Sequence, residues 1–130
     1  ILDEKSISYD LFVNNTFKLK EELLTLLKNL KSDNCKVAGI GASTKGNVLL
    51  QFYEITADIL ECIGEVNEDK FGRFTPGTKI PIIPENEVLE SDFDYLLILP
   101  WHFRDFFLNN KKFKKKKLIF PLPKVEIINT

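Results

Sequence analysis

The spacing of hydrophobic residues predicts an amphipathic helix near the start of the chain. From Thr16 to about Lys31, leucines recur at three- and four-residue intervals, with lysines and glutamates between them. The leucines of this stripe are Leu19, Leu23, Leu26, Leu27 and Leu30. Residues 1–15 have no clear period, so we expect them to be a linker from an upstream domain. Residues 16–130 are then a single domain with this helix at its amino end.

After this helix, short apolar runs alternate with helical patterns. We expect strands at 35–40, 59–66, 80–83, 95–99, 118–120 and 125–128, and helices at 44–54, from Pro84 and at 102–110. The unbroken run 95–99 is typical of a central strand covered on both faces, whereas Pro81 marks 80–83 as an edge strand. The alternation predicts an α/β fold, with a mostly parallel sheet between two helical layers. Ligands of such folds bind at the carboxyl edge of the sheet.

Composition narrows the class of protein. A chain of 130 residues that is 44% hydrophobic and carries a net charge of -1 fits one globular domain and does not indicate nucleic-acid binding. The apolar runs are too short for a membrane span or a signal peptide, so we expect a cytoplasmic protein with no nucleic-acid or membrane partner. Lysines from Lys111 to Lys117 fit a solvated loop. Because the sequence lacks methionine and begins at Ile1, we expect a segment of a larger protein.

The segment 37–47 has the form of a strand, a glycine-rich turn and a helix. Gly39 and Gly41 permit close backbone approach, Ser43 or Thr44 can cap the helix, and Lys45 adds positive charge where a phosphate would bind. The alternative is a tight turn with no ligand. The dinucleotide fingerprint has a third glycine where this chain has Thr44, which argues against NAD.

A second polar segment follows the next expected strand. Glu65 stands where an acidic side chain accepts hydrogen bonds from ribose in many nucleotide-binding folds, although it also fits a solvated strand end. Arg73 has the chemistry to clamp a phosphate, or is a surface arginine. Residues 74–78 fit a lip beside the glycine loop or a simple β-turn. His102, at the end of the central strand, has no evident partner side chain, so a structural role fits it better than a catalytic one.

Four blocks, GIGASTKGN, EVNEDKFGRFTPGTKIPI, DYLLILPWHF and IFPLPKVEII, together resemble the C-terminal domain of S-adenosylmethionine-dependent sugar C-methyltransferases. The resemblance covers most of the chain, including the order and spacing of the blocks. It implies a Rossmann-like domain that forms one wall of a cleft for a nucleotide-linked keto-deoxysugar. The substrate-binding residues that it implies are Gly39, Gly41, Ala42, Ser43, Lys45, Gly46 and Asn47 in one wall, with Glu65, Asn67, Lys70, Gly72, Arg73, Thr75, Pro76, Gly77 and Thr78 in the other. Trp101 and Phe103 match the block that ends the central strand. Relatives commonly have aspartate where this chain has Glu65, and His102 occupies a variable position.

The resemblance also implies the chemistry of a whole enzyme. A proton next to a sugar keto group is removed, and the resulting carbon attacks the methyl group of S-adenosylmethionine. An upstream methyltransferase domain of the same polypeptide is expected to bind S-adenosylmethionine and to supply the general base, while zinc is expected in a further N-terminal domain. Cys35 and Cys62 lack the spacing of a zinc site, so we expect neither a metal nor a cofactor in this chain. We therefore expect the isolated domain to be inactive.

Two other functions fit the same pattern. One is a stand-alone nucleotide-binding or regulatory domain for NAD or a similar ligand, because sheet topology does not specify function. The other is a structural module that docks on a catalytic partner through Phe103, Phe106 and Phe107.

Overall fold

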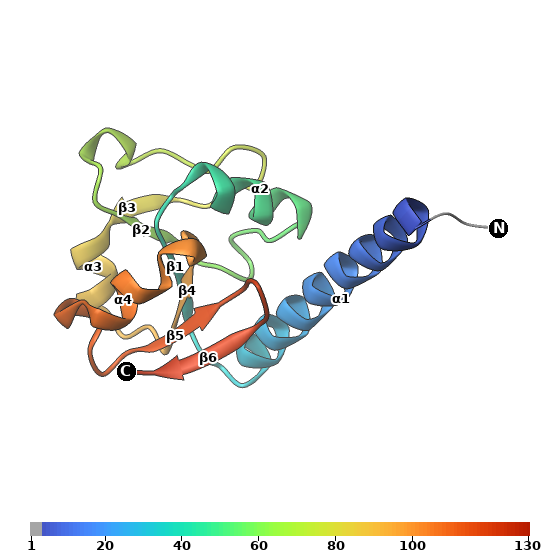
Figure 1. Ribbon diagram of the computed structural model, residues 1–130. Helices are drawn as coiled ribbons and strands as arrows, with labels where there is room; N and C mark the ends of the chain where they lie inside the picture. Colours follow the sequence, from blue (N-terminus) through green and yellow to red (C-terminus); the bar gives the residue numbers. More distant parts are fainter. Residues whose placement is uncertain (1–3) are drawn as a thin grey trace.

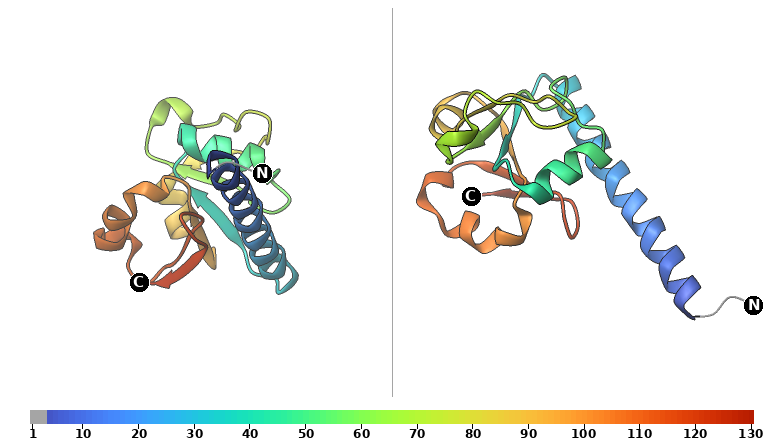
Figure 2. Two further views of the ribbon diagram at one scale, coloured as in Figure 1. Left: turned by 45° about the vertical axis from the view of Figure 1, so that its right-hand side comes forward. Right: turned by 90° about the horizontal axis from the view of Figure 1, so that it is seen from above.

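The computed structural model describes residues 4–130, with side chains from Asn14 onward. Helix α1 (Glu4–Ser32) is longer than expected and includes most of the segment that we interpreted as a linker; residues 1–3 of that segment lie outside the described residues. No proline or glycine interrupts residues 4–32, so the helix that the leucine stripe stabilises can extend toward the amino end at one hydrogen bond per added residue. In Figures 1 and 2 the first half of α1 projects away from the rest of the domain.

The remaining elements alternate much as the sequence predicted. They are β1 (Val37–Ile40), α2 (Thr44–Phe52), β2 (Ile63–Glu65), η1 (Glu68–Lys70), β3 (Ile82–Pro84), α3 (Glu85–Glu90), β4 (Tyr95–Ile98), η2 (Trp101–Phe103), α4 (Arg104–Asn109), η3 (Lys111–Phe113), β5 (Lys117–Phe120) and β6 (Glu126–Asn129). Strand β2 begins four residues later than the expected 59–66, because residues 56–59 form a turn closed by the bond from Ile59 N to Thr56 O.

The sheet confirms the predicted fold class. Its six strands run in the order β3-β2-β1-β4-β5-β6, and every neighbouring pair is parallel except β5 with β6. Strands β1 and β4 are central and β3 is an edge, as the apolar run and Pro81 predicted. The chain leaves β1 in one direction and returns beside it as β4, so the carboxyl ends of β1 and β4 mark the switch point at which such sheets hold ligands.

Two apolar layers enclose the sheet, in a Rossmann-like layout (Figure 1). On one face, Leu23 and Leu27 of α1 pack with Leu49 of α2 against the sheet. On the other face, Val88 of α3 and Phe107 of α4 cover Ile98 and its neighbours. Among the α1 side chains that the structure describes, those that join this core run from Leu23 to Leu30. Among residues 4–130, no helix is both long and apolar enough to cross a membrane.

Candidate functional site

Two hollows lie at the carboxyl edge of the sheet, and the loops after β1 and β4 form the ridge between them. The first, the switch-point crevice, has a volume of about 310 Å³ and lies against Gly41, Ser43, Glu65 and Phe103. The second, the α1–α2 groove, has a volume of about 920 Å³ and is bordered by α1, α2, η2 and the segment 122–123. Thr44 and Lys45 line the groove, whereas Gly41 and Ser43 of the same loop line the crevice.

At two positions of the glycine loop, packing explains why the residue is a glycine. Gly41 has φ +87°, and a Cβ there would lie 2.7 Å from the Pro100 ring. A Cβ on Gly46 would lie 2.7 Å from Cβ of Leu99, so this glycine allows α2 to approach the end of β4. As predicted, Ser43 caps α2, with its Oγ accepting from Gly46 N at 3.1 Å. The glycines thus meet steric needs of the turn itself, and phosphate binding by this loop stays a prediction.

Glu65 connects the two polar loops through its carboxylate. Its Oε1 accepts from Ala42 N at 2.9 Å, and its Oε2 accepts from Val66 N at 2.8 Å and Asn67 N at 2.9 Å. Lys70 Nζ donates to Ala42 O at 2.8 Å and lies 3.8 Å from Oε1. Burial favours a higher pKa for Glu65, but the amide hydrogen bonds and Lys70 outweigh it, and the pKa is lowered overall. Glu65 is therefore a buried anion that bonds the two loops, so the interpretation as a solvated strand end is wrong, and a ribose contact stays a prediction.

Most polar groups of the expected second wall, in the segment 67–78, already form hydrogen bonds within the domain. Asn67 caps η1 by accepting from Asp69 N at 3.1 Å. The hydroxyls of Thr75 and Thr78 are buried and lie 2.5 Å apart, and Thr75 Oγ1 also accepts from Ile80 N at 2.8 Å. Pro76 O accepts from Gln51 Nε2 of α2 at 2.8 Å, beside Gly77.

Arg73 is exposed, and neither hollow is lined by any residue from 71–84. The structure therefore brings Gly41, Ser43 and Glu65 together, but not residues 73–78. A cleft wall formed by 73–78 stays a prediction.

The switch-point crevice is lined by aromatic rings and ion pairs. Phe103, Phe106 and Phe107 contribute the rings, and Lys112 Nζ lies 2.5 Å from Glu85 Oε1. Phe107 is buried, at 5% exposed, whereas Phe103 and Phe106 are 58% and 57% exposed. This crevice occupies the position at which a dinucleotide would bind in a related topology.

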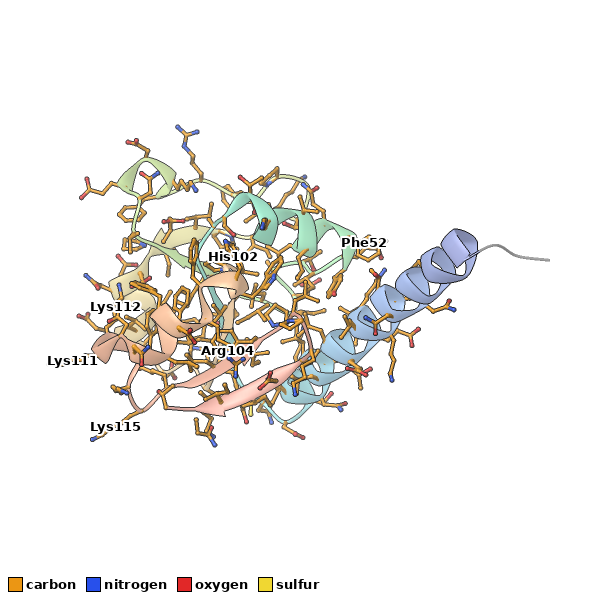
Figure 3. The ribbon with its side chains drawn as sticks, viewed as in Figure 1. Phe52, His102, Arg104, Lys111, Lys112 and Lys115 are labelled. Carbon is orange, nitrogen blue, oxygen red and sulfur yellow. The ribbon has the colours of Figure 1, made fainter. Side chains whose placement is uncertain are left out.

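The α1–α2 groove has an apolar floor and a polar rim. Leu49 and Tyr53 of α2, Trp101, Leu122 and Pro123 contribute apolar surface. Lys45, His102 and Arg104 stand along the rim, and Figure 3 labels His102 above Arg104, between Lys111 and α1 in that view. Arg104 is already paired, because its Nη2 lies 3.1 Å from Glu126 Oε2. The ring of His102 lies between Trp101 and Phe103, at centroid distances of 6.1 and 4.3 Å.

Sequence reasoning missed this groove, because its walls come from segments far apart in the chain. One signal was present in α2. Val48 and Phe52 form one stripe at helical spacing, and Leu49 and Tyr53 form the next. A nine-residue surface helix buries one face, and the structure buries Leu49 and Tyr53 while leaving Val48 61% and Phe52 43% exposed.

Among the described residues, no three His, Cys, Asp or Glu side chains are grouped as metal ligands would be. Cys35 and Cys62 are both free thiols, and burial raises the pKa of Cys62 to about 11. The side-chain amide oxygen Oδ1 of Asn47 is buried without a hydrogen-bond partner among the residues that the structure describes.

Comparison with known proteins gives a family for this arrangement. Residues 3–123 match the family described as the C-methyltransferase C-terminal domain. The chain is also 27% identical over 124 residues to the C-methyltransferase NovU of Streptomyces niveus, an alignment that covers 93% of this chain and 30% of that protein. The chain thus spans less than a third of the length of this relative. Since the family match extends over nearly all of the described residues, the chain belongs to the C-methyltransferase C-terminal domain family.

Proposed function

We propose that this domain forms one wall of the binding cleft for a nucleotide-linked keto-deoxysugar, in an S-adenosylmethionine-dependent C-methyltransferase. The observation that carries the proposal is the position of Lys45, in the first turn of α2 and at the rim of the α1–α2 groove. A helix amino end carries partial positive charge and unpaired N–H groups, so an added lysine makes it a suitable contact for a diphosphate.

The charge of Lys45 is available for this role. Lys45 is exposed and has no ion-pair partner among residues 14–130, in contrast to Arg104, whose guanidinium faces Glu126. Trp101 and Tyr53 supply flat apolar surface in the same groove, next to which a nucleoside would fit. The groove thus combines a cation, a helix amino end and aromatic surface within one hollow.

The reacting groups are proposed to lie in the larger part of the enzyme. S-adenosylmethionine supplies the methyl group when bound there, and the base that removes the sugar proton belongs to the same part. The role of this chain is to hold the diphosphate and orient the sugar, which is why we propose that the isolated domain is inactive.

A stand-alone NAD-binding function has less support. Both carboxylate oxygens of Glu65 already accept backbone N–H groups, so the ribose-binding role of that position would require the exchange of existing bonds. The crevice in which a dinucleotide would bind is also lined by Phe103, Phe106 and Phe107.

The proposal is tested by steady-state kinetics of the full-length enzyme with Lys45→Ala. We expect KM for the nucleotide sugar to rise about tenfold, because a charge-assisted contact to phosphate is lost, while the affinity for S-adenosylmethionine is unchanged. Lys111→Ala is the matched control, since it removes another exposed lysine on the far side of the domain from α1 in Figure 3. An unchanged KM in Lys45→Ala would contradict the proposal.

A further inference from the structure

An exposed apolar surface joins α1 to α2 along the groove. Phe17 is 51% exposed, Val48 61% and Phe52 43%. The rings of Phe17 and Phe52 lie 6.0 Å apart, and Val48 precedes Phe52 by one helical turn. We call these three side chains the α1–α2 apolar surface. Single exposed apolar residues are common, but a contiguous group, of which Val48 and Phe52 also line one side of the groove, is typical of an interaction site.

The direction of α1 places this surface on the side of the domain from which the preceding chain comes. The groove is lined by Asn15, Thr16 and Leu19, near the middle of α1 and ahead of the leucines that pack on the sheet. Figures 1 and 2 show the first half of α1 leading away from the domain on the side of α2. A polypeptide connected to the amino end of α1 therefore begins beyond this projecting half, on the same side of the domain as the groove.

The comparisons indicate what such a polypeptide is. The family is a C-terminal domain, and NovU extends over more than three times the length that aligns with this chain. We propose that the α1–α2 apolar surface is the seat of the preceding methyltransferase part of the same polypeptide, while the Lys45 and Trp101 side of the groove stays open to the nucleotide sugar. This inference rests on the proposed function and adds the surface through which the two parts meet.

The charge at the edge of the surface defines the partner more closely. Lys20 Nζ lies 5.1 Å from the centre of the Phe52 ring, at the edge of the surface. The complementary surface is therefore apolar with acidic residues at its edge. Two copies of this domain that met through this surface would bring like charges together, which disfavours self-association.

Photocrosslinking in the full-length protein tests the surface directly. Benzoylphenylalanine in place of Phe52 keeps an aromatic side chain at an exposed position, so folding should be retained. We expect an intramolecular crosslink whose mass-mapped partner peptide lies upstream of this domain. Ile127 is the matched control position, because it is 44% exposed and lies on β6, outside the groove. The same probe at Ile127 should give no upstream crosslink.

Every other result overturns the inference. A crosslink from Phe52 to a second copy would make the surface a self-interface, and no crosslink, or equal crosslinks from both positions, would mean that the preceding part docks elsewhere. A negative charge at the surface gives a second test. Phe52→Glu should raise the rate of tryptic cleavage between the two parts about tenfold, because an aromatic side chain buried between them is lost. Ile127→Glu should leave this rate unchanged. Equal cleavage rates would contradict the proposed seat.

These tests separate the inference from the proposed function. Crosslinking and cleavage are measured without a sugar nucleotide, whereas the Lys45→Ala test measures substrate use. An upstream crosslink with an unchanged KM in Lys45→Ala would retain the docking surface and reject the substrate contact. A raised KM in Lys45→Ala without an upstream crosslink would retain the substrate contact and reject the docking surface.

Discussion

At the end of β2, one carboxylate holds the glycine loop to the loop before η1. Glu65 accepts three backbone N–H groups, and hydrogen bonds to a charged acceptor are worth about 1.5–3 kcal/mol each. A local sequence pattern could place an acidic residue at this edge of the sheet, but it could not show that backbone amides would occupy both oxygens. That depends on how the loops at 42 and 66–67 approach each other in space.

Glu65→Gln should therefore destabilise the domain by about 2–3 kcal/mol at pH 7, because one amide N–H₂ would face backbone donors. The pKa of Glu65 is lowered in the folded state, so its stabilising effect is present at neutral pH and is lost as pH falls through that pKa. Urea unfolding of wild type and variant should show a difference in the free energy of unfolding that decreases below about pH 4. A difference that stays constant with pH would contradict this account of the carboxylate.

A comparison of Gly41 with Gly72 distinguishes two physical reasons for a glycine: a positive φ, and a lack of space for a Cβ. Both have positive φ, but a Cβ on Gly41 would meet Pro100 at 2.7 Å while one on Gly72 would have no atom within 4 Å. Gly72→Ala should cost about 1 kcal/mol from backbone conformation alone, and Gly41→Ala about 2–4 kcal/mol because overpacking is added. Thermal unfolding of the two variants checks the order. Equal losses would mean that the glycine loop can move away from Pro100.

At the scale of elements, periodicity predicted most of the fold because each pattern reflects local burial. The leucine stripe marked the packed half of α1, and the apolar run 95–99 marked the central strand β4 (Tyr95–Ile98). Residues 1–15 were interpreted as a linker because they carry no leucine stripe, and a helix can extend into such a segment through its own backbone hydrogen bonds. The groove was missed for the related reason that it lies between elements.

In the 130-residue chain, substitutions in the core and on the exposed α1–α2 apolar surface should change the free energy of unfolding by different amounts. Leu27→Ala removes a side chain that is 0% exposed in the core and should cost about 3 kcal/mol. Val48→Ala changes a side chain that is 61% exposed and should stay within about 0.5 kcal/mol. Urea denaturation of both variants tests this contrast. A large loss in Val48→Ala would show that Val48 is packed, which would remove one member of the α1–α2 apolar surface.

The whole molecule presents two hollows on either side of one ridge, and they suit different contacts. The switch-point crevice is small and lined by Glu65, the Glu85–Lys112 ion pair and aromatic rings, whereas the α1–α2 groove is larger and opens beside Lys45 and His102. From the sequence, the position of the site at the carboxyl edge could be predicted, since it follows from strand order and loop composition. The sequence could not predict on which side of the ridge the larger hollow lies, because this depends on the direction of α1 and on the side chains of α4.

The most direct test of the central claim is an NMR amide-shift titration of this chain with a thymidine diphosphate sugar, NAD and S-adenosylmethionine in turn. The account predicts that only the sugar nucleotide shifts amides, that binding is weak, and that the shifts concentrate at 44–48 and 101–104 along the groove rim. A response to NAD alone, centred on Gly41, Ser43 and Glu65 in the switch-point crevice, would contradict it.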